Sequence, residues 1–488
     1  MGTLSLGWDN YLFLELTGRQ ERSSTLKDQS FFYPSANLSF LFTQAFHMPS
    51  WWNYGKLRLS YGIVGNAPET YTANIVYEQG SDNGFTWNTI PSSWGNADIR
   101  PEKKYEYEIG LESKFLNNRL GIDVSYYNNR VKDQILSTPQ PSTSGVKNVL
   151  MNVGEVANHG WDISISATPI LTRDFRWDLT ANYGVYKNKV VKLADGVPYL
   201  EILNSGGSGI KIQAVEGQPM GDIYAQVPQV NENGEYLVSD KGLYLNQTEL
   251  QKVGNINPAG VGGLFNSFSY KNVFLDFSID FRIGGDVINE MNQYATAVGL
   301  TPESLKYRDT EHGGLSYYYP GDNNSSGIPV QVDPSTGAGP NGEIIYHDGI
   351  ILPGVVASTG ERNTRIIPAG YYYNTTYNWG TEAEQLTYRH SVFDNSYVKL
   401  RELTIGYQFP EKMISKLGLG RLSVSVFGRN LFYFYKALKN YDAESSVGTS
   451  WANQATVGSS TTATRSFGVS LLVDNENVVF LFLYQRIG

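Results

Sequence analysis

Apolar and polar residues alternate along most of this chain, and the alternation limits its possible folds more than any other feature. In residues 105–115, for example, Tyr107, Ile109 and Leu111 alternate with glutamates and a glycine. Successive side chains of a β-strand point to opposite faces of a sheet, so each such run has one apolar and one polar face. Helical periodicity is nearly absent. The sequence therefore predicts an all-β protein built from long strands.

We identify about thirteen such runs by their period of two. One of them changes phase, because Val398 and Leu400 are followed by Leu403 and Ile405, and this predicts a β-bulge near Arg401-Glu402. The runs are 3–9, 11–18, 35–46, 55–64, 102–115, 120–137, 150–169, 174–190, 262–270, 273–283, 396–409, 421–431 and 464–473.

Short and long connections alternate between these runs. The long ones are 19–34, 65–101, 138–149, 191–261, 284–395 and 432–463. A membrane β-barrel has short turns on one side and long loops on the other, and about 9–11 tilted residues cross the bilayer. The pattern favours a transmembrane antiparallel β-barrel with long extracellular loops and short periplasmic turns. A large soluble antiparallel sheet with one solvated face is the alternative.

The composition excludes other classes of protein. The net charge of −9 argues against nucleic acid as a partner. The absence of cysteine excludes disulfides and thiolate metal sites, and no apolar run approaches the ~18 residues of a membrane-spanning helix. The N-terminus carries no signal-peptide pattern. We therefore expect either a cytosolic protein or a fragment of a longer one, and the barrel pattern favours the fragment.

Several short segments carry a resemblance to one family. They are Ser396–Pro410 (SYVKLRELTIGYQFP), Gly428–Phe432 (GRNLF), Tyr441–Glu444 (YDAE), Gly55–Gly62 (GKLRLSYG) with Gly65-Asn66, Ile99–Lys103, Asn255–Pro258 and Gly284–Asp286. Together, and in the order in which they occur along the chain, they resemble the SusC/RagA-type TonB-dependent outer-membrane transporters. Ala443 stands where that family usually has proline.

The resemblance implies that residues 1–473 are the C-terminal part, roughly the last thirteen strands, of a barrel of about 22 strands. It implies a protein that is not an enzyme, that lies in outer-membrane lipid and that imports oligosaccharides or peptides with a SusD-like surface lipoprotein. The plug and N-terminal domains are absent from this sequence, and the TonB complex would act through that missing region. A passive porin or adhesin barrel and a soluble aromatic-rich glycan-binding protein are the alternatives.

The C-terminus departs from the family pattern. A final strand near Ser466–Leu471 should end soon afterwards on an aromatic residue, but the chain continues to Gly488. We expect residues 474–488 to be an atypical extension. An altered reading frame is our preferred explanation for the segment Leu472–Gly488, and a gene-model error or a fourteenth strand are the alternatives.

No catalytic, cofactor or metal site is predicted. The five histidines show no helical i, i+3 or i, i+4 spacing, and no nucleophile or phosphate-loop motif occurs. Aromatic residues in the long loops are the best ligand candidates, because flat rings stack on sugar rings or peptide side chains. For any single one of them, packing between loops is the commoner role. The candidates are Trp87, Trp94, Tyr371, Tyr372, Tyr373 and Trp379.

Overall fold

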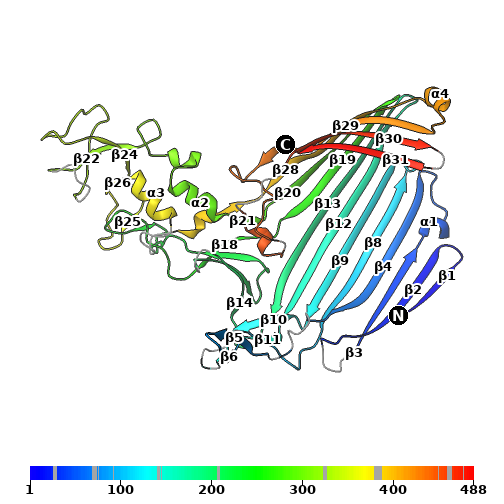
Figure 1. Cartoon of the computed structure of the whole chain (residues 1–488), viewed down its shortest axis with the longest axis horizontal. Coiled ribbons are helices and arrows are strands. Elements are labelled where there is room, and N and C mark those ends of the chain that lie inside the picture. The colour runs from blue at the N-terminus through cyan, green and yellow to red at the C-terminus, as the bar shows by residue number, and fades with distance from the viewer. Residues whose placement is uncertain are drawn as a thin grey trace.

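The computed structural model describes the chain except for residues 26–29, 69–73, 75, 92, 140–142, 144, 206–208, 322–326, 379–386, 449, 459–463, 476–477 and 488. Within the described part, no helix is long and apolar enough to cross a membrane. One large antiparallel sheet dominates the molecule, and a lobe of loops, short strands and helices extends from one of its ends (Figure 1).

The large sheet has fourteen strands, each hydrogen-bonded to its neighbours in sequence order. Each run expected from the alternation pattern corresponds to one of these strands. They are β1 (Gly2–Trp8), β2 (Leu12–Arg22), β3 (Ser30–Phe40), β4 (Trp52–Asn66), β8 (Glu102–Phe115), β9 (Leu120–Lys132), β12 (Glu155–Leu171), β13 (Phe175–Lys192), β19 (Gly260–Tyr270), β20 (Val273–Ile283), β28 (Tyr397–Gln408), β29 (Arg421–Lys436), β30 (Ser466–Asn475) and β31 (Val478–Ile487).

The fourteenth strand, β31, lies in the C-terminal extension and pairs with β30 along its whole length. The expected bulge is also confirmed, because the pairing register of β28 with both of its neighbours shifts between Leu400 and Glu402. Among the described residues the sheet is open, with β1 and β31 as its two edge strands.

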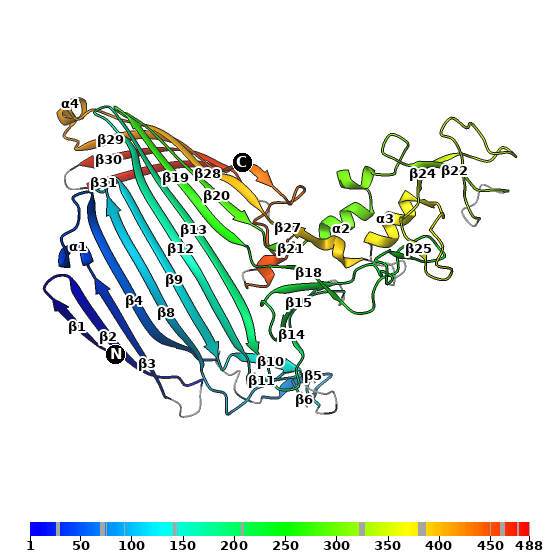
Figure 2. The same cartoon turned by 180° about the vertical axis from the view of Figure 1, so that it is seen from behind.

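All the long connections lie at one end of the sheet and all the short ones at the other, as the sequence predicted (Figures 1 and 2). This follows from the pairing order, since consecutive antiparallel strands reverse direction. The short end also carries α1 (Phe42–Ala45), α4 (Glu411–Ile414) and η5 (Ser415–Leu417).

The long end carries all the other elements. They are β5 (Glu78–Asp82), β6 (Phe85–Thr89), β7 (Ser93–Trp94), β10 (Ile135–Pro139), β11 (Asn148–Asn152), β14 (Tyr199–Ser205), β15 (Ile210–Val215), β16 (Asp222–Ala225), β17 (Leu237–Val238), β18 (Gln251–Asn255), β21 (Asp286–Ile288), α2 (Glu290–Ala297), η3 (Pro302–Leu305), β22 (Leu315–Tyr318), β23 (Val330–Gln331), β24 (Tyr346–Ile350), β25 (Val355–Val356), β26 (Ile367–Pro368), α3 (Ala369–Tyr377), η4 (Tyr388–Ser391), β27 (Val392–Asp394) and η6 (Asn453–Ala455).

The pairing register aligns the apolar residues of neighbouring strands on one face of the sheet. One row across β4, β8, β9, β12 and β13 reads Leu57, Leu111, Val124, Ile163 and Tyr183. The adjacent row on the opposite face reads Lys56, Glu112, Asp123, Ser164 and Asn182. Because one register holds across all these strands, their apolar residues form one continuous face and their polar residues the other.

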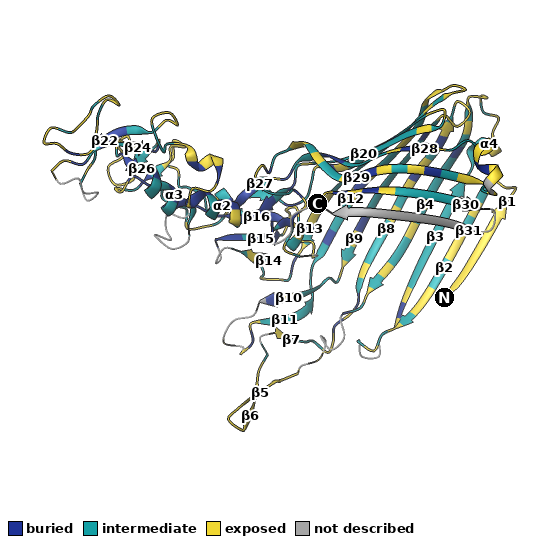
Figure 3. Ribbon diagram, turned by 45° about the horizontal axis from the view of Figure 1, so that its top comes forward, coloured by how far each residue is buried: buried dark blue, intermediate teal, exposed yellow. Residues whose placement is uncertain are grey.

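The polar face is the inner one, because loops fold against it. The hydroxyl of Tyr186 donates to Asn257, and the side chain of Asn188 accepts a hydrogen bond from the backbone N–H of Met220. The apolar face carries no such cover, and Ile109 is 47% exposed on it. Figure 3 shows this alternation of exposed and less exposed residues along the strands.

The packed hydrophobic core lies in the lobe. Its largest cluster joins Ile212 and Ile223 from the connection before β19 to Ile288 and Val392 from the connection before β28, and to Ala452 from the connection before β30. Three connections that are far apart in sequence therefore share one core, which fixes the lobe to the end of the sheet.

We predict that Leu111→Arg will destabilise the protein in a bilayer by roughly 2–4 kcal/mol, because a charge at mid-depth on a lipid-facing wall is poorly solvated. Leu111 lies halfway along β8 on the apolar face and is 43% exposed. The measurement is chemical unfolding in lipid vesicles. The matched control is Ser60→Arg, which places the same side chain on the polar face opposite Glu108 and should be nearly neutral. Equal losses in the two variants would contradict the assignment of the faces.

Candidate functional site

The lobe encloses a cavity of about 400 Å³, which is large enough for a small-molecule ligand. Its walls come from α2, η3, α3, the end of β24 and the residues around η4. The lining residues are Tyr244, Asn292, Thr296, Glu303, Lys306, Tyr307, Ile350, Leu352, Pro353, Tyr372, Tyr373, Tyr377, His390 and Phe393.

Local sequence explains how the two helices of this cavity form. The side chain of Asn289 caps α2 by accepting a hydrogen bond from the backbone N–H of Asn292, at 3.0 Å. Pro368 stands at the N-cap position of α3 with φ −61° and ψ 140°; its ring fixes φ, and its extended ψ places it just outside the helix. In α3, Tyr373 and Tyr377 are four residues apart and therefore share one side of the helix.

Three tyrosines and a histidine form the aromatic wall of the cavity. The ring of Tyr372 lies 5.1 Å from that of Tyr373 and 6.0 Å from that of Tyr377, centroid to centroid. Tyr377 stacks on His390 at 4.2 Å with an interplanar angle of 17°. These contacts join α3 to η4 and present several ring faces and edges to the cavity.

Hydrogen bonds hold some of these rings in place. The hydroxyl of Tyr373 donates to the backbone carbonyls of Glu303 and Lys306, at 3.0 and 3.2 Å. The hydroxyl of Tyr244 donates to the carbonyl of Pro353 at 3.1 Å. The ammonium of Lys306 lies 4.7 Å from the centre of the Tyr307 ring. The guanidinium of Arg308 lies 5.2 Å from the centre of the Tyr373 ring. The cavity is therefore a fixed aromatic surface with cationic side chains near it.

The aromatic wall is uncharged at neutral pH. Burial, together with the positive charge of the neighbouring Arg389, lowers the pKa of His390 to about 4. Burial also raises the pKa of Tyr244 and of Tyr373 to about 12. Such a wall suits an uncharged ligand that is bound by ring stacking and a few hydrogen bonds.

The structure distributes the predicted ligand residues over three places. Tyr372 and Tyr373 line the cavity, while Tyr371 lies beside a second hollow that includes Tyr319. The other aromatic candidates are elsewhere: Trp87 is 46% exposed on β6, and Trp94 lies on β7. Trp379 lies outside the described residues.

Sequence reasoning missed Tyr244, Tyr377 and His390. The four-residue spacing of Tyr377 from Tyr373 could have signalled a shared helix face, but only if α3 had been recognised within the long connection. Tyr244 and His390 come from distant segments that only the folded lobe brings together.

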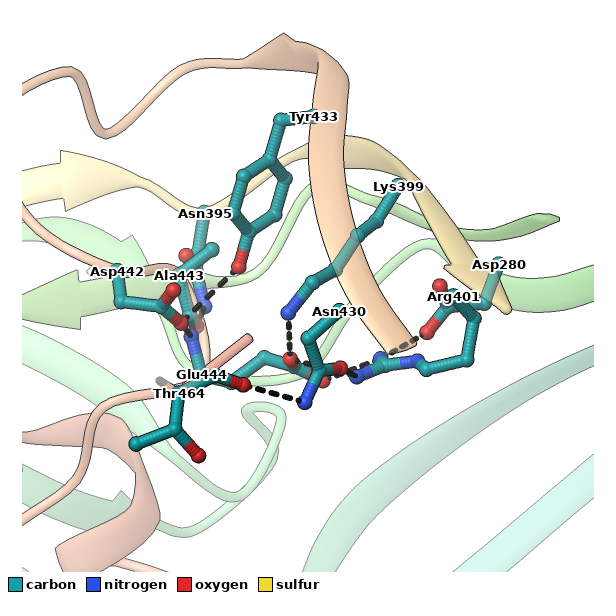
Figure 4. Close-up of polar contacts among 10 residues, drawn as sticks. All are labelled: Asp280, Asn395, Lys399, Arg401, Asn430, Tyr433, Asp442, Ala443, Glu444 and Thr464. Atoms are coloured by element: carbon teal, nitrogen blue, oxygen red, sulfur yellow. Dashed lines mark hydrogen bonds and ion pairs between the residues drawn. The ribbon is translucent and has the colours of Figure 1, made fainter. Parts of the chain in front are cut away.

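A second polar cluster ties one loop to the inner face of the sheet. We call Asp280, Lys399, Arg401 and Glu444 the ionic clamp (Figure 4). Glu444 contacts the ammonium of Lys399 at 2.5 Å and the guanidinium of Arg401 at 2.5 and 2.9 Å, and Arg401 also pairs with Asp280. Lys399 is 1% exposed, and this carboxylate is its ion-pair partner.

Further hydrogen bonds fix the clamp in position. Asn430 accepts from Arg401 at 2.9 Å and donates to the carbonyl of Thr464. The hydroxyl of Tyr433 donates to Asp442, and Asp442 in turn accepts from the backbone N–H of Glu444. Three of the motifs noted in the sequence, around Lys399, Asn430 and Asp442, therefore meet at one point, where β28 and β29 meet the last long loop.

Comparisons with known proteins support one family. Residues 1–215 match the family model described as TonB dependent receptor-like, beta-barrel. Over 247 residues the chain is 30% identical to TonB-dependent receptor SusC of Bacteroides thetaiotaomicron, covering 46% of this chain and 24% of that protein. It is 24% identical to TonB-dependent receptor P3 of Formosa agariphila over 78% of this chain and 35% of that protein.

Solved structures agree on the fold. The structure of the RagAB peptide transporter superposes with a TM-score of 0.62 at 19% identity, over 90% of this chain and 44% of that chain. This chain spans about a quarter to a third of the length of the curated relatives described above.

We predict that Glu444→Gln will release the loop 437–465 from the sheet and cost about 2 kcal/mol, because Lys399 loses its charge partner while Glu444 itself is 32% exposed. The measurement is the rate of proteolysis within this loop. The control is Glu361→Gln, which removes an exposed carboxylate at the same end of the molecule and should leave the rate unchanged.

The same clamp predicts an acid-sensitive loop. Burial alone would raise the pKa of Glu444, but hydrogen bonds from Arg401 and Lys399 outweigh it and lower the pKa to about 2. Because the pKa of Glu444 is lower in the folded state, its negative charge stabilises that state at pH values above the ordinary glutamate pKa of about 4.5. This stabilisation is lost as the pH falls towards about 2. Pepsin should therefore cut the loop faster across that window in the native protein. A native cleavage profile with the same pH dependence as that of Glu444→Gln would contradict the clamp.

Proposed function

Because this chain belongs to the TonB-dependent receptors of the SusC/RagA type, which are outer-membrane proteins, we propose that it is part of an active importer of oligosaccharides or peptides. The observation that carries the proposal is the arrangement of the long connections. They gather at one end of a membrane sheet and fold into a lobe with its own core and an aromatic cavity.

Oligosaccharides are the substrate class that the cavity supports best. Sugar rings have apolar faces that stack on tyrosine, and hydroxyls that pair with amide and carboxylate groups. The cavity offers the rings of Tyr372 and Tyr377 next to polar groups on Asn292 and Glu303. A peptide with an aromatic or small side chain is the second substrate that fits such a wall.

The polar inner face supports passage of a hydrophilic solute. Arg58 donates to the carboxylate of Asp123 at 2.6 and 3.0 Å and to the hydroxyl of Ser125 at 3.1 Å, so these two charges are paired. Paired charges with intervening hydroxyl groups give a wettable wall that holds a neutral solute weakly. Weak contacts suit a path along which a ligand must move.

The proposed importer has two partners. A SusD-like surface lipoprotein would approach the lobe, because the lobe is the part of the chain at the ligand-capturing side. The TonB complex would supply energy, since an outer membrane holds no ATP. In this family the energised contact runs through a plug domain.

The first test separates active import from the alternatives. In the native host, deletion of the gene should abolish growth on one class of oligosaccharide and leave growth on its free monosaccharide intact. Depletion of TonB should give the same loss. Growth that persists without TonB but requires the gene would establish a passive barrel, and a protein that fractionates with the soluble contents of the cell would be a glycan binder.

The second test addresses the cavity. We predict that Tyr372→Leu raises the oligosaccharide concentration for half-maximal uptake about tenfold, because one aromatic stacking contact is removed. Trp87→Leu removes an exposed aromatic residue of the long end that lies outside the cavity lining, so it should change uptake less than twofold. The measurement is uptake of labelled oligosaccharide at equal protein in the membrane. A larger effect at Trp87 would place the ligand outside the cavity.

A further inference from the structure

The outer face of the sheet carries a band of basic side chains next to the long connections. We call Lys103, Arg130, Lys132, Lys187 and Lys189 the basic band. They lie on β8, β9 and β13, within the last few residues of each strand at the long end, and all are exposed.

The pairing register places this band on the lipid side of the sheet. Across β8, β9, β12 and β13, one row reads Tyr105, Arg130, Ala157 and Lys189, and the next reads Tyr107, Asn128, His159 and Lys187. The third row is Ile109, Tyr126, Trp161 and Val185. Rows alternate between faces residue by residue, so these three share the apolar face.

The boundary between water and lipid falls within these rows. The rings of Tyr107, Tyr126 and Trp161 contact one another across the strands, with centroids 6.4 and 4.9 Å apart. Aromatic girdles of this kind mark the interfaces of membrane barrels. From this girdle to the far end of β8, at Phe115, the strand has a length that spans a bilayer. The basic band therefore lies at the depth of the lipid headgroups.

Carboxylates of the protein neutralise only part of the band. Glu155 pairs with Arg130 at 3.0 Å and with Lys132 at 4.0 Å. In the described part of the chain, no carboxylate lies within ion-pair distance of Lys103, Lys187 or Lys189.

The remaining positive charge of the basic band contrasts with the negative charge of the chain and of the inner face. The chain as a whole carries −9, and the inner face of the same strands holds Glu106, Glu108, Asp123 and Asp162. A hollow of about 220 Å³ adjoins Lys103, with Tyr105, Ile63 and the ion pair of Arg100 with Asp133, at 3.4 Å, among its walls. Positive charge beside an aromatic and apolar hollow fits a ligand with an anionic head and an apolar body.

We propose that the basic band binds the phosphate groups of an anionic lipid in the membrane leaflet at the long end. Lysine ammonium groups act as point charges for phosphate, and the guanidinium of Arg130 can add a paired contact. The acyl chains then lie along Ile109 and Leu111, and the sugar or glycerol part of the lipid packs on Tyr105 and Trp161. This inference requires the apolar face to lie in lipid, but it is independent of the transported substrate.

Lysines at a membrane interface can also extend towards water without binding any particular lipid. The two roles differ in phosphate specificity, which makes them separable. Lysines that only extend towards water would not distinguish a lipid with a phosphate group from the same lipid without it. A phosphate-binding site would bind the phosphorylated lipid more tightly.

The test measures the association of lipid with the protein as isolated from the host membrane and inserted in phosphatidylcholine nanodiscs. The probes are a bisphosphorylated glucosamine-disaccharide lipid and the same lipid without phosphate. We expect a clear preference for the phosphorylated lipid. The triple variant Lys103→Gln, Lys187→Gln, Lys189→Gln should weaken this preference by about fivefold per lysine removed.

Two further variants keep the result interpretable. Lys56→Gln, Lys104→Gln, Lys114→Gln removes the same charge from the inner face of β4 and β8 and should retain the full preference. Replacing the three band lysines by arginine should also retain it. Heat-modified migration on gels reports whether each variant is inserted and folded.

Three results would overturn the proposal. They are equal association of the phosphorylated and dephosphorylated lipids, equal loss in the inner-face control, and complete displacement of the lipid by inorganic phosphate at matched concentration. The last would make free phosphate the ligand. Since the protein remains inserted in each case, none of these results would affect the proposed import function.

Discussion

The pairing of backbone groups between neighbouring strands is the constraint on which the rest of this structure depends. Inside a bilayer no water can satisfy an N–H or C=O group, so every strand that crosses it must be paired along its length. Between its two edge strands, β1 and β31, the sheet meets this requirement with strands paired in sequence order, and a constant register follows. That register gives the apolar outer face, the polar inner face and the separation of short turns from long loops.

The same constraint explains why stabilising contacts lie where they do. The outer face meets lipid and the inner face is polar, so neither side of the sheet can hold a conventional core. The largest buried apolar cluster lies in the lobe, and ion pairs join the last long loop to the inner face of the sheet. Lys399 stands on β28 and Glu444 on that loop. A buried lysine is tolerated there because its carboxylate partner comes from the loop that the pair immobilises.

Much of the sheet could be predicted from sequence, whereas the lobe could not. A period of two is a local property, so strands such as β8 and β20, and the phase change at Leu400, are visible without tertiary information. The aromatic cavity depends on α3 meeting η4 and on Tyr244 arriving from another connection. These contacts form by packing among irregular loops. Irregular loops have no periodic pattern of apolar residues in the sequence. The extension after β30 was interpreted through family resemblance as an anomaly, although its β-branched and aromatic residues form a paired strand.

The shared core of the lobe has a consequence for the order in which this protein can assemble. Strands β20 and β28 are neighbours in the sheet, yet residues 284–396 lie between them. Until that whole segment has crossed to the far side, the edge of β20 has no partner. The cluster around Ile212 also requires Ala452, which belongs to a still later connection. The lobe therefore folds only after β29 has joined the sheet. In a chain that stalls before that point, most strands of the sheet would be paired while the long connections were still unfolded. Quality-control proteases that act on such loops would recognise late assembly failures, whereas early failures would leave bare strand edges for chaperones.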